Sequence, residues 1–195
     1  GGCVKWYSDG SPDEQPELRS RVAAADKAGM QVLIHAIGEA ANWYALDALE
    51  FAASRNGFRD RRSRIEHAHR LRRLDFSRLS NAKIIASMQP FLFYYGGLTT
   101  GDDYRAIMKS GVKIAFGSDA SMVDLNPLLG IHAAVNAGNR SISVVEAVRA
   151  YTLGSAYAEF QEKQKGTIEV GKLADLVILS DDIFTMNSRR IGSVK

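Results

Sequence analysis

The chain has 195 residues, of which 46% are hydrophobic and 24% charged, a composition typical of a globular domain with a sizeable core. Its formal net charge of +3 is too small to indicate nucleic-acid binding, and no apolar run approaches the roughly 20 residues that cross a bilayer. The single cysteine, Cys3, excludes an internal disulfide and fits a reducing compartment, so we expect a cytoplasmic protein.

Short apolar runs alternate with helical sequence along the first 120 residues. Strands are predicted at about 4–7, 31–37, 64–68, 83–88 and 112–117. Helices are predicted at about 17–28, 39–55, 72–81 and 102–109, and the Tyr- and Gly-rich stretch 91–100 is predicted to be a loop. Strands that alternate with helices in this way favour an α/β fold with a parallel sheet.

The sequence changes character towards its end. A helix is predicted from Pro127 to about residue 137, and another over 143–160, where Ser143 and Glu146 form a capping-box pattern. Over 166–179, short β runs alternate with a glycine-containing turn and no helix intervenes. We therefore predict an α/β unit over 1–160 and a small β appendage over 161–195.

Three of the predicted strands end in residues that bind metals or carry protons: His35, His67 and Asp119. In a barrel of alternating strands and helices, the carboxyl ends of the strands converge on one mouth. Imidazole is the commonest ligand of transition metals, and a carboxylate can bind a metal and accept a proton. The alternatives are histidines satisfied by backbone carbonyls and an aspartate that caps a turn or helix.

Other residues have a chemical and a structural interpretation. Lys5 interrupts an apolar strand, either as part of a site or as an edge residue facing solvent. His69 shares a strand face with His67 by alternation and is a candidate on the substrate side. His132 is predicted to be structural, and residues 94–97 (Tyr-Tyr-Gly-Gly) are either a substrate lid or an ordinary loop.

Seven motifs occur in a fixed order along nearly the whole chain: VKWYSDG (4–10), HAIG (35–38), RIEHA (64–68), ASMQP (86–90), AFGSD (115–119), EAVRAYT (146–152) and GKLADLV (171–177). Together they closely resemble the amidohydrolase superfamily, in particular the amidohydrolase 3 group, which includes N-substituted formamide deformylase. The resemblance implies a partial (β/α)8 TIM-type barrel, about strands four to eight, followed by a short β segment of the flanking β-sandwich.

The resemblance also implies a function: hydrolysis of a non-peptide carbon–nitrogen bond by metal-activated water. The expected substrate is a small-molecule amide, N-formyl or N-acyl compound. Matched position by position, His35 and His67 are metal ligands, and Lys5 corresponds to a lysine that many members carboxylate and use as a ligand. Asp119 corresponds to the aspartate that binds metal and carries the proton in catalysis. Zinc is the expected ion, with one or two ions in the complete enzyme.

The sequence departs from the family pattern before Lys5, where the HxH motif of the first barrel strand has no counterpart. His67-Ala68-His69 does not replace it, because it matches strand six. His69 and Gln89 remain candidates for contact with the substrate or support of the ligands.

An alternative function follows from the missing motif: a catalytically incomplete barrel fragment that self-associates through open sheet edges. We expect a homo-oligomer or a missing N-terminal segment. A further alternative is a non-hydrolytic α/β protein with incidental histidines.

Overall fold

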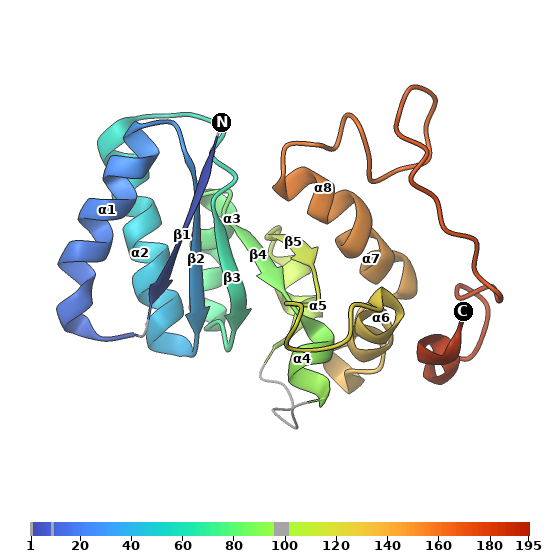
Figure 1. The fold of residues 1–195 in the computed structure, drawn as a ribbon. Helices are drawn as coiled ribbons and strands as arrows, with labels where there is room; N and C mark the ends of the chain where they lie inside the picture. The colour runs from blue at the N-terminus through green and yellow to red at the C-terminus, as the bar shows by residue number, and fades with distance from the viewer. Residues whose placement is uncertain (1, 9, 96–101) are drawn as a thin grey trace. The chain divides into compact units, whose positions relative to one another are not determined.

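The computed structural model describes residues 2–8, 10–95 and 102–195 (Figure 1). The chain forms two compact units, which are described separately. The first contains the residues up to Met88 together with Ile107–Lys113, and the second contains Gln89–Ala106 with Ile114–Lys195. Helix α5 (Tyr104–Lys109) and strand β5 (Lys113–Phe116) run across the boundary between the units.

The first unit is a parallel sheet with helices between its strands. Its strands are β1 (Cys3–Ser8), β2 (Gln31–Ile37), β3 (Arg64–His69) and β4 (Ile85–Met88), and each pairs in parallel with the next. Its helices are α1 (Gln15–Lys27), α2 (Glu39–Asn56) and α3 (Phe76–Asn81), the last preceded by a 3₁₀ turn. This confirms the α/β fold and the parallel sheet.

Helices α1 and α2 cover one face of this sheet (Figure 1). The hydroxyl of Ser8 donates a hydrogen bond to the Ala41 carbonyl of α2, so alternate residues of β1 face the helices. Val32 and Ile34 of β2 are buried on the same side. Full burial of one such side chain stabilises the fold by about 1.5–3 kcal/mol. We call the opposite face of the β1–β4 sheet the inner face.

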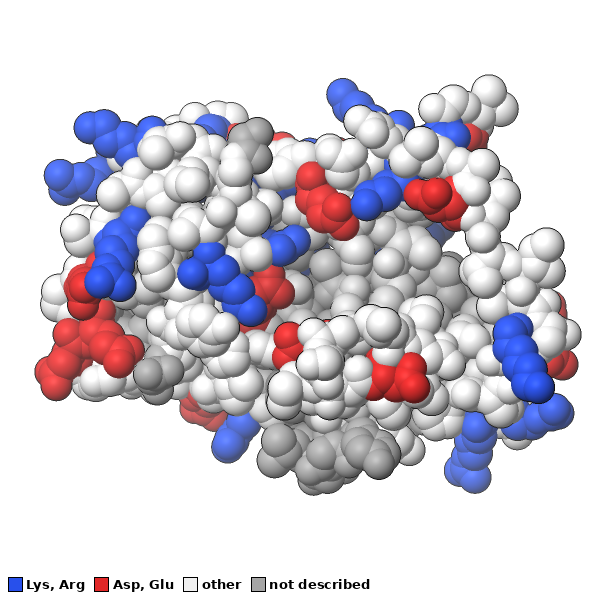
Figure 2. Space-filling view, in the orientation of Figure 1, with Lys and Arg blue, Asp and Glu red and all other residues white. Residues whose placement is uncertain are grey.

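Charged groups tie the first two helices to the loop that follows α2. Asp26 is buried in α1, and its carboxylate accepts hydrogen bonds from the side chains of Asn56, Arg59 and Arg61 at 2.6–3.1 Å. Figure 2 shows Lys and Arg side chains gathered over the carboxyl ends of α1 and α2, with Asp and Glu over the opposite ends. This distribution complements the helix dipoles. The hydrogen bonds of Arg59 and Arg61 to Asp26 thus clamp the loop after α2 to α1.

The second unit is mainly helical. It contains α4 (Pro90–Tyr95), α6 (Pro127–Val135), α7 (Val144–Arg149) and α8 (Ser155–Ala158), with a π-helical turn between the last two. The loop predicted over 91–100 is wrong for its first residues, which continue the helix that Pro90 starts. The capping box of Ser143 and Glu146 is confirmed. In α5, Asp103 rather than Asp102 caps the helix, accepting a hydrogen bond from the amide of Ala106.

The predicted strands of the last 35 residues are not formed. No residue from 161 to 195 lies in a strand, and Ser188–Ser193 form a 3₁₀ helix that contacts α6. Ile168 and Ile178 are 87% and 95% exposed. A strand is stabilised by a ladder of hydrogen bonds and a buried face, and the described residues 166–179 form neither. By its contacts 161–195 belongs to the second unit, and its role as a flanking appendage stays a prediction.

Candidate metal site

Four side chains stand in one row across the carboxyl ends of the first four strands. Tyr7, His35, Glu66 and Ser87 are successive register partners from β1 to β4. Register partners in a parallel sheet project from the same face, which here is the inner face. The rings of Tyr7 and His35 lie with centroids 4.8 Å apart and planes inclined by 35°. The row therefore places His35 between an aromatic ring and a carboxylate.

His67 reaches this row through an irregularity in β3. Its register partner is Ala36, which is buried on the helix-covered side, so a regular strand would direct His67 away from His35. The register instead shifts after Ala36, and His67 and Ala68 adopt left-handed backbone angles, with φ of 69° and 49°. The two imidazole rings consequently lie edge to face, with centroids 4.4 Å apart and planes at 75°.

Lys5 lies two residues before Tyr7 on the same face of β1. Its Nζ is 5.5 Å from the centroid of the Tyr7 ring, a cation–π distance, and its side chain is exposed. Lys5, Tyr7, His35 and His67 thus form a continuous series of contacts on the inner face. Carboxylation of Lys5 stays a prediction.

The histidine pair fits part of a metal site. Tetrahedral zinc holds imidazole nitrogens at about 2.0–2.1 Å, so both rings of an adjacent pair can reach one ion. Across the described ranges 2–8, 10–95 and 102–195, no group of three or more His, Cys, Asp or Glu side chains is placed to hold a metal. A complete site therefore needs a ligand of another kind, such as Lys5, or a further residue.

Glu66 is a residue that the sequence analysis missed. Its carboxylate accepts a hydrogen bond from the Ser87 hydroxyl at 2.6 Å, and its other oxygen lies 2.8 Å from Nε of Arg64. The signal was present in the strand, where Arg64 and Glu66 alternate with the buried Ile65. That alternation is typical of a strand with one polar face.

Asp119 belongs to the second unit, on the turn after β5. It is half-buried and has a φ of 58°. The end of β5 is fixed by two hydrogen bonds, from the Ser155 hydroxyl to the Phe116 carbonyl at 2.9 Å and from the Tyr151 hydroxyl to the Gly117 carbonyl at 3.4 Å. Burial raises the pKa of Tyr151, so this hydroxyl stays protonated and able to donate. The role of Asp119 as a metal ligand and proton carrier stays a prediction.

His69 and Gln89 are both buried. The His69 carbonyl accepts hydrogen bonds from the Gly38 amide at 3.0 Å and from Nδ2 of Asn42 at 2.8 Å, which joins the end of β3 to the start of α2. Gln89 follows β4 directly. These observations place the two residues beside strand ends, and their contact with substrate stays a prediction.

His132 is held within the second unit, in line with a structural role. Its Nδ1 lies 3.2 Å from the Ser188 carbonyl, and its ring meets that of Tyr94 edge to face at 5.9 Å. Tyr94 is therefore part of the packing of α4 on α6. The rest of the suggested lid, Gly96 and Gly97, lies outside the described residues.

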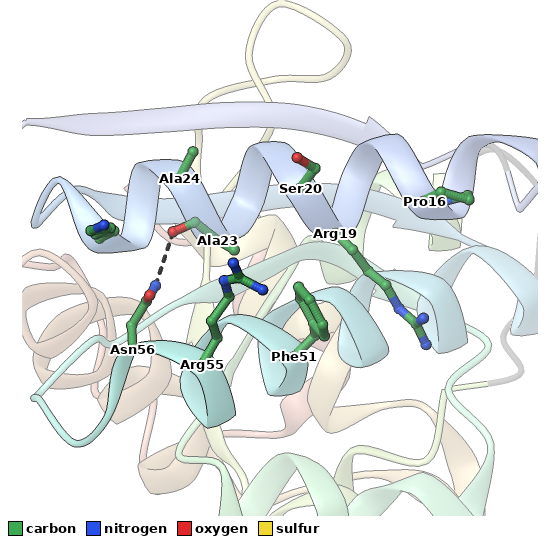
Figure 3. A pocket seen from close by; sticks show the side chains of 9 residues that line it. Pro16, Arg19, Ser20, Ala23, Ala24, Phe51, Arg55 and Asn56 are labelled. Atoms are coloured by element: carbon green, nitrogen blue, oxygen red, sulfur yellow. Dashed lines mark hydrogen bonds between the residues drawn. The ribbon is translucent and has the colours of Figure 1, made fainter.

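A groove of about 420 Å³ lies elsewhere, between α1 and α2 (Figure 3). Figure 3 shows Phe51 and Arg55 reaching from α2 towards α1, and Asn56 donating a hydrogen bond to the Ala23 carbonyl. None of the predicted site residues lines this groove. It is a gap between two packed helices on the helix-covered side of the sheet, and the candidate chemistry lies on the inner face.

The model of the amidohydrolase family matches residues 6–195. This chain belongs to the amidohydrolase family. Family membership confirms the resemblance that the ordered motifs indicated. Within the described residues, no helix is long and apolar enough to cross a membrane.

Three similar proteins are longer than this chain, and each is matched over part of its length. Protein LONG AFTER FAR-RED 3 of Arabidopsis thaliana is 34% identical over 91% of this chain and 34% of its own length. N-substituted formamide deformylase of Arthrobacter pascens is 27% identical over 93% of this chain and 37% of its own. The crystal structure of an uncharacterized metal-dependent hydrolase from Pyrococcus horikoshii OT3 superposes with a TM-score of 0.80 at 26% identity, covering 96% of this chain and 46% of that one. The chain thus spans about a third of the length of these curated relatives.

Proposed function

We propose that this chain is the carboxyl-terminal part of a metal-dependent amidohydrolase that cleaves a non-peptide carbon–nitrogen bond in a small-molecule amide. One observation carries the proposal: the bulge in β3 brings His67 against His35 at the carboxyl ends of neighbouring strands. A bulge next to an active site is a common device for aiming a side chain.

The proposed architecture assigns β1 to β5 to strands four to eight of a (β/α)8 barrel. The parallel pairing of β1 to β4 in chain order supports this assignment. The segment 161–195 would return to a flanking β-sandwich. Its exposed apolar residues, among them Ile168 and Ile178, support the view that it pairs with chain beyond this sequence.

His35, His67 and Lys5 would hold the metal, with Asp119 assigned as a further ligand by its motif. Zinc suits imidazole and oxygen ligands, and catalytic zinc leaves one coordination position for water or substrate. When bound, such an ion polarises a carbonyl and lowers the pKa of water to about 7. Asp119 would accept the proton of the attacking water at its carboxylate and pass it to the leaving nitrogen. Tyr151 and Ser155 would keep the strand end that carries Asp119 in place.

N-formyl and N-acyl amines are the substrates that we propose to test first. The similarity to N-substituted formamide deformylase supports N-formyl amines. The cytoplasmic location expected from the single cysteine stays a prediction.

A second function is favoured by the open edge of the sheet. Within the described residues, β1 pairs with β2 alone, and its other edge carries no strand. Such an edge is a template for pairing with another chain. The alternative is a catalytically incomplete barrel fragment that forms a homo-oligomer or is completed by a missing N-terminal segment.

Metal content per chain, measured together with turnover of N-formyl and N-acyl amines, tests these proposals. We expect His35→Ala and His67→Ala each to abolish binding of the metal that the wild-type chain retains. His132→Ala is the matched control, because His132 lies in the helical unit, and it should keep the metal. Retention of the metal by both His35→Ala and His67→Ala would refute the ligand assignment. Binding without turnover, by a stable oligomer in sedimentation, would favour the incomplete fragment.

A further inference from the structure

Glu66 is a buried charge that the ligand assignment does not use. Its side chain is only 12% exposed, although an ionised carboxylate is costly to bury unless it is paired. One of its oxygens accepts a hydrogen bond from the Ser87 hydroxyl of β4, and the other forms an ion pair with the Arg64 guanidinium of its own strand without hydrogen-bond geometry. The carboxylate is therefore held in one place by two neighbouring strands.

The register decides which charge lies nearer to the histidine pair. Glu66 is the partner of His35, whereas Arg64 is the partner of Leu33, one row earlier along the strands. The negative end of the ion pair thus stands in the row of His35 and the positive end in the row behind it. Because the pair is largely buried, solvent screens its field only weakly.

We propose that Glu66 is a positioning residue for the metal site, supplying a fixed negative charge beside His35 that retains a divalent cation there. The proposal rests on the proposed function, since it concerns the same site. Arg64 offsets part of this charge from the row behind, and Ser87 fixes the orientation of the carboxylate. Groups that surround metal ligands typically change metal affinity by about 10–100-fold when they are removed.

Two variants separate this electrostatic role from a purely structural one. Glu66→Gln keeps the size of the side chain and an acceptor for Ser87, and it removes the negative charge. Arg64→Gln breaks the same ion pair and removes the positive charge. A structural role predicts that both variants weaken metal binding, because both break the network. The electrostatic role predicts that Glu66→Gln weakens metal binding and that Arg64→Gln does not.

The experiment is a zinc titration of the full 195-residue chain against a chromophoric chelator, with the absorption spectrum of the cobalt-loaded chain as a second readout. Glu50→Gln is the matched control, because Glu50 also pairs with an arginine, Arg78, at 2.7 Å between α2 and α3. We expect Glu66→Gln to bind zinc about 10–100-fold more weakly and to alter the cobalt spectrum. Arg64→Gln should bind as tightly as the wild type or more tightly, and Glu50→Gln should match the wild type.

Several results would overturn the proposal. Zinc binding by Glu66→Gln equal to that of the wild type would remove its basis while leaving the histidine site intact. A loss in Arg64→Gln as large as in Glu66→Gln would assign the network a structural role. Should Glu66→Gln not fold, as judged by circular dichroism, Arg64→Gln decides: zinc binding as tight as that of the wild type or tighter supports the proposal, and weaker binding contradicts it. Failure of the wild-type chain to bind zinc would overturn this proposal together with the proposed function.

Discussion

The two faces of the β1–β4 sheet differ at the carboxyl ends of the strands. On the helix-covered face, Val32 and Ile34 are buried against α1 and α2, and the nearby charged residue Asp26 clamps helix to loop. On the inner face, Leu33 and Ile85 are buried one row earlier, and His35 and Glu66 stand in the polar row at the strand ends. The comparison teaches that charge serves the fold on one face, whereas on the other it serves the proposed chemistry.

The largest effect on stability is expected at Asp26, on the helix-covered side. Asp26→Ala should lower the free energy of unfolding by about 3–5 kcal/mol, because it leaves two arginines without their buried carboxylate. Urea unfolding measures this change. Asp60→Ala is the control, since Asp60 is 55% exposed and pairs with Arg62, and it should cost at most about 1 kcal/mol. Equal costs for the two variants would contradict the clamp.

Substituting two adjacent residues of β2 compares the contributions of the two faces to stability directly. Ile34→Ala should cost about 2–5 kcal/mol because it leaves a cavity under the helices. His35→Ala should change the free energy of unfolding by less than about 1 kcal/mol, because its side chain is half-buried on the inner face. Thermal and urea unfolding of both variants check the difference. A large loss in His35→Ala would show that the inner face is structural as well.

The smallest effect is expected in the pH dependence of the free energy of unfolding, through Asp26 on the helix-covered side. Burial raises the pKa of Asp26, but hydrogen bonds from Arg61, Asn56 and Arg59 outweigh it and hold the pKa below its ordinary value. A lowered pKa in the folded state stabilises the protein above about pH 3.9, the pKa of the unfolded state. This stabilisation is lost as the pH falls through the folded pKa.

Urea unfolding at a series of pH values checks this dependence. The stability of the wild-type chain should fall below about pH 4, whereas that of Asp26→Asn, which cannot titrate at this position, should fall less steeply. Parallel curves for the two proteins would show that other carboxylates, such as Asp47, dominate the acid response. The pKa of Asp47 is also lowered, because hydrogen bonds from Arg19 and Gln15 outweigh its burial.

The sequence predicted the alternation of strands and helices in the first unit well, because short apolar runs and helical periodicity are local signals. It also placed His35 and His67 at strand ends. It failed over 166–179, where β-forming residues have no partner strand, and at Pro90–Tyr95, where aromatic residues continue a helix. Strand formation depends on a neighbour that local sequence does not contain.

The sequence by itself determined which residues could carry chemistry, the order of the strands and the family to which the chain belongs. Only the tertiary structure decided that His67 turns towards His35. Alternation directs His67 to the helix-covered side, and the left-handed backbone at His67 and Ala68 reverses it without a glycine to signal the turn. The register of β2, β3 and β4 likewise decided that Glu66 stands between His35 and Ser87. Pairing between strands distant in sequence sets such neighbours, and no single segment encodes it.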